Sequence, residues 1–411
     1  MFSGFCVRVL VVSNLYPPVV RGGYEVECSG VVDRLREHHD VRVLVSTERA
    51  DEAPQQNHVT RQLALLEEGT RNTLRAPIAA RAAIGITHYA LALQRPDLIW
   101  VWNADGLPQT AIRVLADSGA PLAFRVCEHW FARVMANDRF SMHLQGGENG
   151  LRDRAWGVTM RVYNRLSGLR YDPDQPVRAA ISWNSAAIKR MAPAPPAIRP
   201  VLERIVHSTS RKLPDLASIV RAPDREPLAL FLGRRDAMKG ADVAIRAIGL
   251  LRTEHDLAVR FILAGPASDS DPGMIERVAR EAGVSHLIEE LASQDSEGVQ
   301  ALLTRAHVLI VPSTWAEPYP LVTIEGAAAG VPIVASSAGG IPEFVRDGVE
   351  GLLFAPGDAR GCADALLSVF RDPVATQLRL EAARVASRSH DWTHYLDESE
   401  RFAHDAVAAF G

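Results

Sequence analysis

Residues 308–326 read VLIVPSTWAEPYPLVTIEG, a run of apolar residues that passes through a polar loop into a second apolar segment. The first four residues are the kind found in a parallel strand buried on both faces. Pro312 ends this strand, the loop carries Glu317, and Pro320 suits the first turn of a following helix. A buried strand that leads through a short loop into a helix is the repeating unit of an open α/β sheet.

The same alternation extends along most of the chain. Short apolar runs predict strands at Val7–Val12, Val41–Val45, Leu98–Trp102, Leu122–Val126, Leu228–Leu232, Arg260–Ala264, Val308–Val311 and Ile333–Ala335. Segments with apolar residues at helical spacing lie between them, such as Cys28, Val31, Val32 and Leu35. The fold class is therefore α/β, with doubly wound parallel sheets.

One long interruption divides the chain. Prolines cluster at Met191–Pro200, the sequence stays irregular to about Pro227, and the alternation resumes at Leu228. We expect two Rossmann-like domains, residues 1–205 and 206–390. Because ligands of open α/β sheets bind outside the carboxyl ends of the strands, two such domains facing each other would make a deep cleft.

Composition excludes several classes of protein. Of the 411 residues, 47% are hydrophobic and 23% are charged, which excludes a disordered, collagen-like or coiled-coil chain. The formal net charge of −4 does not favour a nucleic-acid partner. The four cysteines lie far apart and form no CxxC pair, so neither a disulfide framework nor a structural zinc site is expected from them.

No membrane or export signal is expected either. The first residues lack a basic segment followed by an apolar core. The uncharged stretch Gly326–Pro342 is rich in Gly, Ala and Ser and is broken by Pro332, so it is not a membrane helix. We expect a cytoplasmic enzyme.

The loop and helix after Val311 suggest an anion site. A helix that starts near Pro320 would leave the N–H groups of Leu321, Val322 and Thr323 without partners, beside the positive end of its dipole. Glu325 would lie about 7–8 Å further along the helix axis. A nucleotide sugar fits this layout. Glu317 as a solvated loop charge, and Glu325 as a partner of the helix dipole, remain the alternatives.

Two further loops follow predicted strands. After Leu232, Gly233 and Arg234 make a turn and Lys239 precedes the next helix. Arginine and lysine are the usual pair for a diphosphate, although this loop lacks the GxxxxGK[ST] pattern of a P-loop and could be solvated surface. After the first strand, Gly22 and Gly23 would let the backbone approach a ligand, or would form only a tight turn.

Several motifs in order resemble one family. They are Asn14–Gly23 with its Pro-Pro and Gly-Gly, Val126–His129, Gly233-Arg234, Lys239-Gly240, Leu263–Pro266, Pro312-Ser313, Glu317 with Glu325, Ala329–Glu343, Asp347–Gly351 and Trp392. With these motifs the chain resembles retaining glycosyltransferases of the GT-B architecture and is similar to glycosyltransferase family 4, the glycosyl transferases group 1. The resemblance also implies that residues from about 391 to 411 form a helix that crosses back to the first domain.

The resemblance assigns roles to individual residues. It implies that Arg234 and Lys239 hold the donor diphosphate, that Glu317 holds sugar hydroxyls and that Glu325 holds the ribose. It places His129, after a strand of the first domain, near the reacting carbon, although a histidine there could equally be a structural hydrogen-bonding residue. The expected catalytic residues are Arg234, Lys239, Glu317 and His129, and the expected donor-binding residues are Gly22, Gly23, Gly233, Pro320, Leu321, Val322 and Glu325.

The implied reaction moves a hexose-type sugar from a nucleoside diphosphate to a hydroxyl of a glycan, a lipid carrier or a small molecule. The leaving phosphate oxygen takes the acceptor proton on the front side, and neither a cofactor nor a metal is expected. Asp269-Ser-Asp271 has the DxD form of metal-dependent glycosyltransferases, but a solvated turn is expected there. A GT-B nucleotide-sugar epimerase and a non-catalytic nucleotide-sugar binder are the alternatives.

The chain departs from the pattern of this family in three places and leaves the role of one segment open. One departure is the second arginine, Arg235, in the turn after Gly233. Val206–Thr209 stands where many relatives carry Asn-Gly, and Pro320 stands where Gly is frequent. The segment Arg152–Tyr171 combines arginines with Trp156 and Tyr163. It would suit an anionic lipid or an acidic acceptor, with the protein at the inner face of the membrane, or it is a solvated helix. The sequence assigns no oligomeric state.

Overall fold

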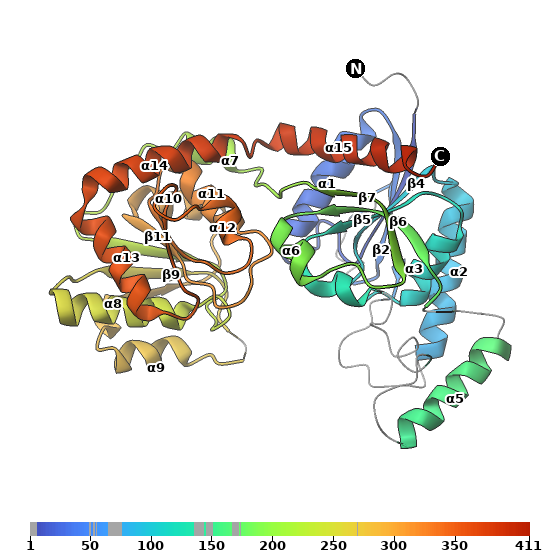
Figure 1. Cartoon of the computed structure of the whole chain (residues 1–411), viewed down its shortest axis with the longest axis horizontal. Coiled ribbons are helices and arrows are strands. Elements are labelled where there is room, and N and C mark those ends of the chain that lie inside the picture. The colour runs from blue at the N-terminus through green and yellow to red at the C-terminus, as the bar shows by residue number, and fades with distance from the viewer. Residues whose placement is uncertain are drawn as a thin grey trace. The chain divides into compact units, whose positions relative to one another are not determined.

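The structure is a computed structural model that divides the chain into two compact units. Unit 1 comprises Met1–Asn184, Ile188–Val206 and Leu396–Gly411, and unit 2 comprises Ser185–Ala187 and His207–Tyr395. The residues that the structure describes are 6–48, 51, 54, 56–64, 76–134, 144, 151–166, 172, 174–268 and 270–411. Each unit contains one parallel sheet (Figure 1).

Unit 1 is built on a seven-stranded sheet of order β3-β2-β1-β4-β5-β6-β7, in which all pairs are parallel. Its strands are β1 (Arg8–Ser13), β2 (Asp40–Ser46), β3 (Val59–Leu63), β4 (Leu98–Asn103), β5 (Leu122–Val126), β6 (Val177–Trp183) and β7 (Ile198–Ile205). Its helices are α1 (Gly23–Arg36), α2 (Ala76–Gln94), α3 (Gln109–Asp117), the 3-10 helix η2 (His129–Arg133), α5 (Leu151–Leu166) and α6 (Ala186–Met191), which begins in unit 2.

Both faces of this sheet are covered. On one face Leu10, Val101 and Phe124 pack in a single core with Ile112 and Leu115 of α3. The last helix, α15 (Trp392–Ala408), begins in unit 2, but its residues from Leu396 onward pack in unit 1, where the ring of Phe402 lies 5.6 Å from the ring of Trp100. The end of the chain thus belongs to the first unit.

Unit 2 is built on a six-stranded parallel sheet of order β10-β9-β8-β11-β12-β13. Its strands are β8 (Leu228–Leu232), β9 (Arg260–Ala264), β10 (Ile288–Leu291), β11 (Val308–Val311), β12 (Ile333–Ser336) and β13 (Leu352–Phe354). Its helices are α7 (Leu213–Ala217), α8 (Ala241–His255), α9 (Met274–Glu281), the 3-10 helix η3 (Ser285–Leu287), α10 (Ser296–Arg305), α11 (Leu321–Ala328), α12 (Ile341–Phe344), α13 (Ala359–Arg371) and α14 (Pro373–Arg388).

The apolar strands of this sheet supply two separate cores. Alternate residues such as Phe231 and Ile310 pack with α8, α9 and α13, whereas Leu230 and Leu309 pack with α10 and α11 on the other face. Side chains of successive strand residues point to opposite faces, so a strand between two helical layers must be apolar at every position. This burial confirms the α/β fold class.

The predicted strands and the remaining strands differ in position. The predicted strands correspond to β1, β2, β4, β5, β8, β9, β11 and β12, each within one residue of its expected bounds. The unpredicted strands are β3, β6, β7, β10 and β13, and four of these are the edges of the two sheets. Edge strands need no apolar residue at every position, as IEEL in β10 illustrates, so an apolar-run criterion misses them.

We expected the segment from Met191 to about Pro227 to be irregular. This expectation is wrong in part, because β7 lies within the segment. Pro200 sits in this strand, and the register of β7 against β6 shifts between Ala179 and Ala180, at the position paired with Pro200. Proline cannot donate to a sheet ladder, and an edge strand with a bulge is where it is tolerated. The proline cluster marks an edge strand as well as the passage between the units.

Gly326–Pro342 contains the end of α11, β12 and the start of α12. Within the described part of the chain, no helix combines the length and the apolar character needed to cross a bilayer. Of the segment Arg152–Tyr171, α5 is described to Leu166, whereas Arg170 and Tyr171 lie outside the described residues.

Candidate active site

The sheet of unit 2 has one point at which its strand order reverses. From β8 the chain proceeds outward through β9 and β10, and from β11 it proceeds in the opposite direction through β12 and β13. Such a reversal leaves a crevice outside the carboxyl ends of the two central strands, where open α/β sheets bind their ligands. The loops at 233–240, 312–320 and 337–340 follow β8, β11 and β12, which are neighbours in the sheet.

Lys239 and Glu317 meet at this reversal. The Lys239 ammonium donates to both carboxylate oxygens of Glu317, at 2.7 Å to Oε1 and 3.0 Å to Oε2. The Glu317 residue is only 6% exposed, and the Ser313 hydroxyl also donates to its Oε1. The Lys239 Nζ also lies 5.2 Å from the centre of the Trp315 ring. The structure thus brings together two of the predicted catalytic residues as one ion pair.

Two glycines with positive φ allow the three loops to approach one another. A Cβ on Gly240 would lie 1.9 Å from the carbonyl oxygen of Pro312, so the Lys239 loop packs directly on the loop after β11. A Cβ on Gly339 would lie 2.4 Å from the backbone nitrogen of Glu317 and 2.3 Å from its carbonyl oxygen. The next residue, Gly340, donates its N–H to that carbonyl at 2.7 Å. The backbone around Glu317 is therefore held on two sides.

The Gly233-Arg234 turn lies in the first of these loops. The Arg234 side chain is 54% exposed, and its Nε lies 3.3 Å from Oδ2 of Asp236. The other oxygen of Asp236 accepts the backbone N–H of Lys239 at 2.8 Å. The second arginine of the turn, Arg235, pairs instead with Glu290. Asp236 therefore organises the loop, and Arg234 keeps an exposed guanidinium.

The helix that follows Glu317 differs from the expectation. Helix α11 begins at Leu321 with Pro320 as its cap, one residue later than predicted. The N–H of Leu321 donates to the Tyr319 carbonyl at 3.2 Å, and that of Thr323 donates to the Pro320 carbonyl at 3.1 Å. The expected three free donors reduce to Val322, whose N–H makes no hydrogen bond with any residue that the structure describes. The tight cap at Pro320 takes up the other two.

Glu325 lies one turn into α11. Its Oε1 accepts a hydrogen bond of 2.6 Å from the Ser210 hydroxyl. Withdrawal from water raises the pKa of the Glu325 carboxyl, while the Ser210 hydroxyl and the charge of Lys212 oppose this rise. Ser210 therefore favours the ionised form of a carboxylate that is otherwise poorly solvated.

The residue between Glu317 and the helix cap, Tyr319, is held by two histidines. Its O–H lies 2.6 Å from Nε2 of His390, and its ring stacks on His207 with centroids 4.9 Å apart. The other ring nitrogen of His390, Nδ1, lies 3.2 Å from the Ala386 carbonyl and donates to it. In the neutral ring Nε2 therefore accepts a hydrogen bond from the Tyr319 hydroxyl. Burial, with the neighbouring His207, lowers the pKa of His390, and the hydrogen bond to Ala386 opposes this shift.

The remaining predicted residues belong to unit 1. Gly22 and Gly23 follow β1 and open α1, and the Gly22 N–H donates to the buried carboxylate of Glu25 at 2.9 Å. A Cβ on Gly22 would meet no atom within 4 Å. His129 begins η2 just after β5 and is partly exposed. Gly22, Gly23 and His129 thus lie at carboxyl ends of strands in the seven-stranded sheet.

No role was predicted from the sequence for Ser210, Asp236, Ser313 or Gly339. Two of these residues could have been found from their spacing. Ser313 precedes Glu317 by four residues and Asp236 precedes Lys239 by three, which are distances typical of local hydrogen bonds. Ser210 lies 115 residues from Glu325, and no local pattern connects them. In the DxD-like turn, Asp269 lies outside the described residues, and Asp271 pairs with Arg277 at 2.6 Å.

Residues 215–387 match the family model described as Glycosyl transferases group 1. Over 189 residues the chain is 32% identical to D-inositol 3-phosphate glycosyltransferase of Corynebacterium aurimucosum, and the alignment covers 45% of each protein. Over 164 residues it is 38% identical to glycogen synthase of Mycobacterium tuberculosis, covering 40% of this chain and 39% of that protein. These alignments therefore span less than half the length of the curated relatives.

Solved structures match over nearly the whole chain. The Anabaena protein HepE in complex with UDP aligns with a TM-score of 0.64 and 17% identity, covering 96% of this chain and 98% of that one. Sucrose-phosphate synthase of Thermosynechococcus elongatus aligns with a TM-score of 0.69 and 17% identity, covering 98% and 99%. At this identity the likeness concerns the fold, which is the two-sheet GT-B architecture.

Proposed function

From the match of residues 215–387 to the model of the glycosyl transferases group 1, we propose that the chain is a retaining glycosyltransferase. It moves a hexose-type sugar from a nucleoside diphosphate sugar to a hydroxyl group of a glycan, a lipid carrier or a small molecule. The observation that carries the proposal is the pairing of Lys239 with Glu317 at the strand reversal of unit 2.

The donor binds by replacing this ion pair. A diphosphate brings negative charge that competes for the Lys239 ammonium, and the exposed Arg234 guanidinium adds a second cation. The N–H of Val322, at the start of α11, is a further donor for a phosphate oxygen. Glu317, released from Lys239 but still held by Ser313, then accepts hydrogen bonds from sugar hydroxyls. Glu325 accepts from the ribose hydroxyls.

Charge stabilisation drives the reaction. As the bond between the sugar and the phosphate breaks, negative charge grows on the leaving diphosphate, and Arg234 and Lys239 stabilise it. The leaving phosphate oxygen accepts the proton of the acceptor hydroxyl, whose oxygen bonds to the sugar carbon on the same face. His129 contacts the transferred sugar, and the Gly22-Gly23 backbone approaches the diphosphate. The two cations supply the countercharge that a metal ion supplies elsewhere.

The matched proteins support a nucleotide sugar as donor. HepE structures contain UDP and, in another crystal, UDP-glucose. The names of the relatives refer to inositol 3-phosphate, glycogen and sucrose phosphate, which all carry hydroxyl groups. A compound that carries hydroxyl groups is thus named for each of these proteins, and a hydroxyl acceptor is proposed for this chain.

We also propose that α5 contacts an anionic lipid surface at the inner face of the membrane. Val158, Val162 and Leu166 follow one another at four-residue spacing, and their exposed fractions are 55%, 51% and 81%. Arg154, Arg161 and Arg165 on the same helix are also exposed. Apolar and basic side chains together are typical of helices that lie on anionic membranes. Sedimentation with vesicles of anionic lipid should decrease for Val162→Glu and should persist for Leu378→Glu, an exposed leucine on α14.

Product analysis is the experiment that tests the activity. The purified protein is incubated with UDP-, GDP-, ADP-, TDP- or CDP-sugars and candidate acceptors, with and without EDTA. We expect a free nucleoside diphosphate and a glycoside of unchanged anomeric configuration, equally in EDTA. A new nucleotide sugar would identify an epimerase instead, and binding without any product would identify a non-catalytic nucleotide-sugar binder.

A thermal-shift series against the bare nucleoside diphosphates selects the donor for this assay. A ligand at 100 times its dissociation constant stabilises the folded protein by about 2.7 kcal/mol, which raises the melting temperature by a few degrees. One stabilising nucleotide defines the donor class. If none stabilises the protein, the proposed diphosphate site is wrong.

A further inference from the structure

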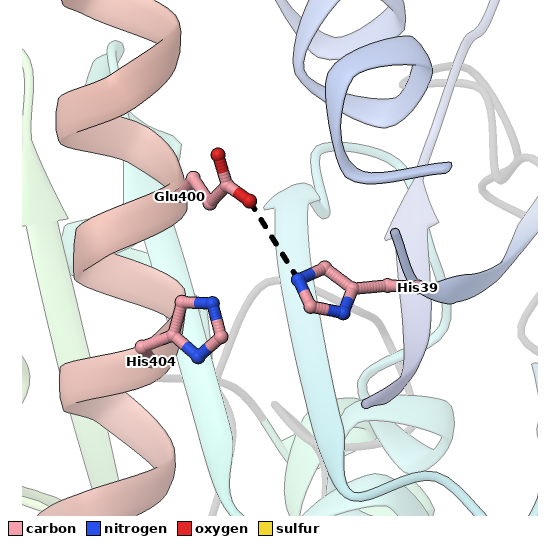
Figure 2. A group of neighbouring side chains, drawn as sticks. All are labelled: His39, Glu400 and His404. Carbon is pink, nitrogen blue, oxygen red and sulfur yellow. Dashed lines mark ion pairs between the residues drawn. The ribbon is translucent and has the colours of Figure 1, made fainter. Parts of the chain in front are cut away.

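Three side chains with metal-binding atoms converge in unit 1, on a part of the molecule that the proposed reaction does not use. His39 lies in the turn between α1 and β2, and Glu400 and His404 lie one turn apart on α15 (Figure 2). One nitrogen of each histidine and one oxygen of Glu400 all lie within 4.8 Å of one another. Each residue is partly buried. From this arrangement we propose that His39, Glu400 and His404 bind a divalent zinc ion.

The donor set suits this metal. Two imidazoles and one carboxylate are a common protein ligand set for Zn²⁺, with a water molecule completing four-coordination. Zinc bonds to nitrogen and oxygen ligands are about 2.0–2.2 Å long, and in a tetrahedral site they place the ligand atoms roughly 3.3 Å from one another. Small rotations of the three side chains toward their common centre are sufficient. Glu400 and His404 already lie on one face of α15, because residues four apart on a helix are neighbours.

The carboxylate is oriented by its surroundings. Oε1 of Glu400 faces Nε2 of His39 at 3.7 Å, while Oε2 accepts a hydrogen bond of 3.2 Å from Arg34. Arg34 also binds Asp397 at 2.9 Å and Glu37 at 3.1 Å, so other carboxylates balance its charge beside the ion. A carboxylate ligand whose second oxygen is held by a neighbouring donor is typical of protein metal sites.

His39 requires one rearrangement. The N–H of Val7 lies 3.3 Å from Nδ1 of His39, so the neutral metal-free ring carries its proton on Nε2. When zinc takes the Nε2 lone pair, that proton moves to Nδ1 and the long contact with Val7 is lost. No net proton is released by His39 in this step, and the ring must turn so that its new Nδ1–H does not face the Val7 N–H.

The site would fasten the end of the chain. Its ligands join the turn after α1 to the part of α15 that belongs to unit 1, where Phe402 packs on Trp100. The ion therefore stabilises the folded unit rather than taking part in sugar transfer, and its test needs no activity measurement.

Calorimetric titration of the metal-stripped full chain with Zn²⁺ alone tests the proposal. We expect one ion per chain and a rise of a few degrees in melting temperature. Glu400→Gln, which keeps the shape of the side chain, and His404→Ala should each weaken binding at least about 100-fold, since changes to the supporting residues of a metal site already cost 10–100-fold. His394→Ala, an exposed histidine on the same helix, should bind as the parent does.

The measurement has clear contrary results. A parent protein that takes up no stoichiometric zinc overturns the site, and so does equal binding by Glu400→Gln and His404→Ala. Circular dichroism in metal-free buffer checks that each variant is folded. If Glu400→Gln or His404→Ala is not folded, His39→Gln takes its place in the titration and must also fail to bind zinc. Co²⁺ gives a second readout, because the parent should show visible absorption bands that Glu400→Gln lacks.

Discussion

The two sheets reverse their strand order in the same way but present different chemistry at the reversal. In unit 1 the reversal lies between β1 and β4, and the loop after β1 offers the backbone of Gly22 beside open space. In unit 2 it lies between β8 and β11, where Lys239 and Glu317 pair and Gly240 and Gly339 bring the loops into backbone contact. One topology thus supports an open loop in one unit and a tightly packed charged site in the other.

This difference separates two ways of building a ligand site. The unit 2 site depends on side-chain charge and close loop packing, so substitutions there should affect chemistry and stability together. The unit 1 loop depends on the absence of a side chain, so a substitution there should affect ligand approach alone. The family match covers residues 215–387, so the proposed donor site in unit 2 lies within the matched segment.

Replacing the paired lysine should have the largest effect. We expect Lys239→Ala to lower the rate of sugar transfer about 10²–10³-fold, because a preorganised charge that stabilises the leaving diphosphate is lost. Binding of the bare nucleoside should change little. Release of nucleoside diphosphate measures the rate, and Arg246→Ala, on the exposed side of α8, is the control. Near-normal turnover of Lys239→Ala would remove this residue from the reaction.

Three glycine-to-alanine variants test this difference between the two units. Gly339→Ala should cost about 2–4 kcal/mol of unfolding free energy, the sum of left-handed strain and overlap with the Glu317 backbone. Gly348→Ala shares the positive φ but has open space around its Cβ, so it should cost about 1–2 kcal/mol. Gly22→Ala, in extended backbone with open space, should stay within about 0.5 kcal/mol of the parent.

Denaturant titration of the three variants gives these values, and donor affinity gives the second readout. Gly22→Ala should weaken donor binding although it leaves stability unchanged. If Gly22→Ala binds the donor as tightly as the parent does, the unit 1 loop does not approach the diphosphate.

Removal of the Ser210 hydroxyl should have a smaller effect. Ser210→Ala takes away a hydrogen bond that opposes the raised pKa of Glu325, so that pKa should rise further. A carboxyl protonates as the pH falls through its pKa, and the loss of donor affinity on acidification should therefore begin at a higher pH in the variant. The affinity at neutral pH should fall about fivefold, which corresponds to one hydrogen bond of about 1 kcal/mol.

Donor affinity measured by calorimetry between pH 5 and 8 tests this shift. Ser218→Ala, which removes an exposed hydroxyl that donates to the Asp215 carbonyl in its own turn, should follow the parent profile. Coincident profiles for Ser210→Ala and the parent would show that Glu325 does not contact the donor as a carboxylate.

The smallest expected effect concerns His390. Because its pKa in the folded protein lies below the ordinary value of 6.5, the unfolded chain binds a proton first as the pH falls. The stability that the neutral ring contributes is present above pH 6.5 and is lost as the pH falls from there toward the folded pKa. His390→Gln should reduce this slope in melting temperature, whereas His394→Gln should leave it unchanged.

Whether a strand could be predicted from the sequence depends largely on its position in the sheet. Interior strands such as β8 and β11 are apolar on both faces, so their composition alone marks them and their loops. Edge strands carry exposed polar residues, such as Glu289 and Glu290 in β10, and β7 even contains Pro200. Their identity depends on a partner strand, which a local pattern does not reveal.

The candidate site was predictable to the same degree. Lys239 and Glu317 lie in loops after interior strands, and sheet order brings those loops together. We expected three free N–H groups at the start of α11, but two of them donate to the carbonyls of Tyr319 and Pro320. The spacing of apolar residues along a helix does not reveal such local hydrogen bonds. The sequence does not indicate the contact between Ser210 and Glu325, because 115 residues separate them. The cluster of His39, Glu400 and His404 in unit 1 likewise joins residues that lie far apart in the sequence.

The assignment of residues 396–411 to unit 1 has a consequence for biosynthesis. The ribosome releases the strands of the first sheet early, but the helix that covers Trp100 emerges only after all of unit 2. Unit 2 can therefore complete its core while unit 1 still exposes an apolar surface. The half of the protein that is made first is the half that matures last, and during that interval it is the part that chaperones would bind.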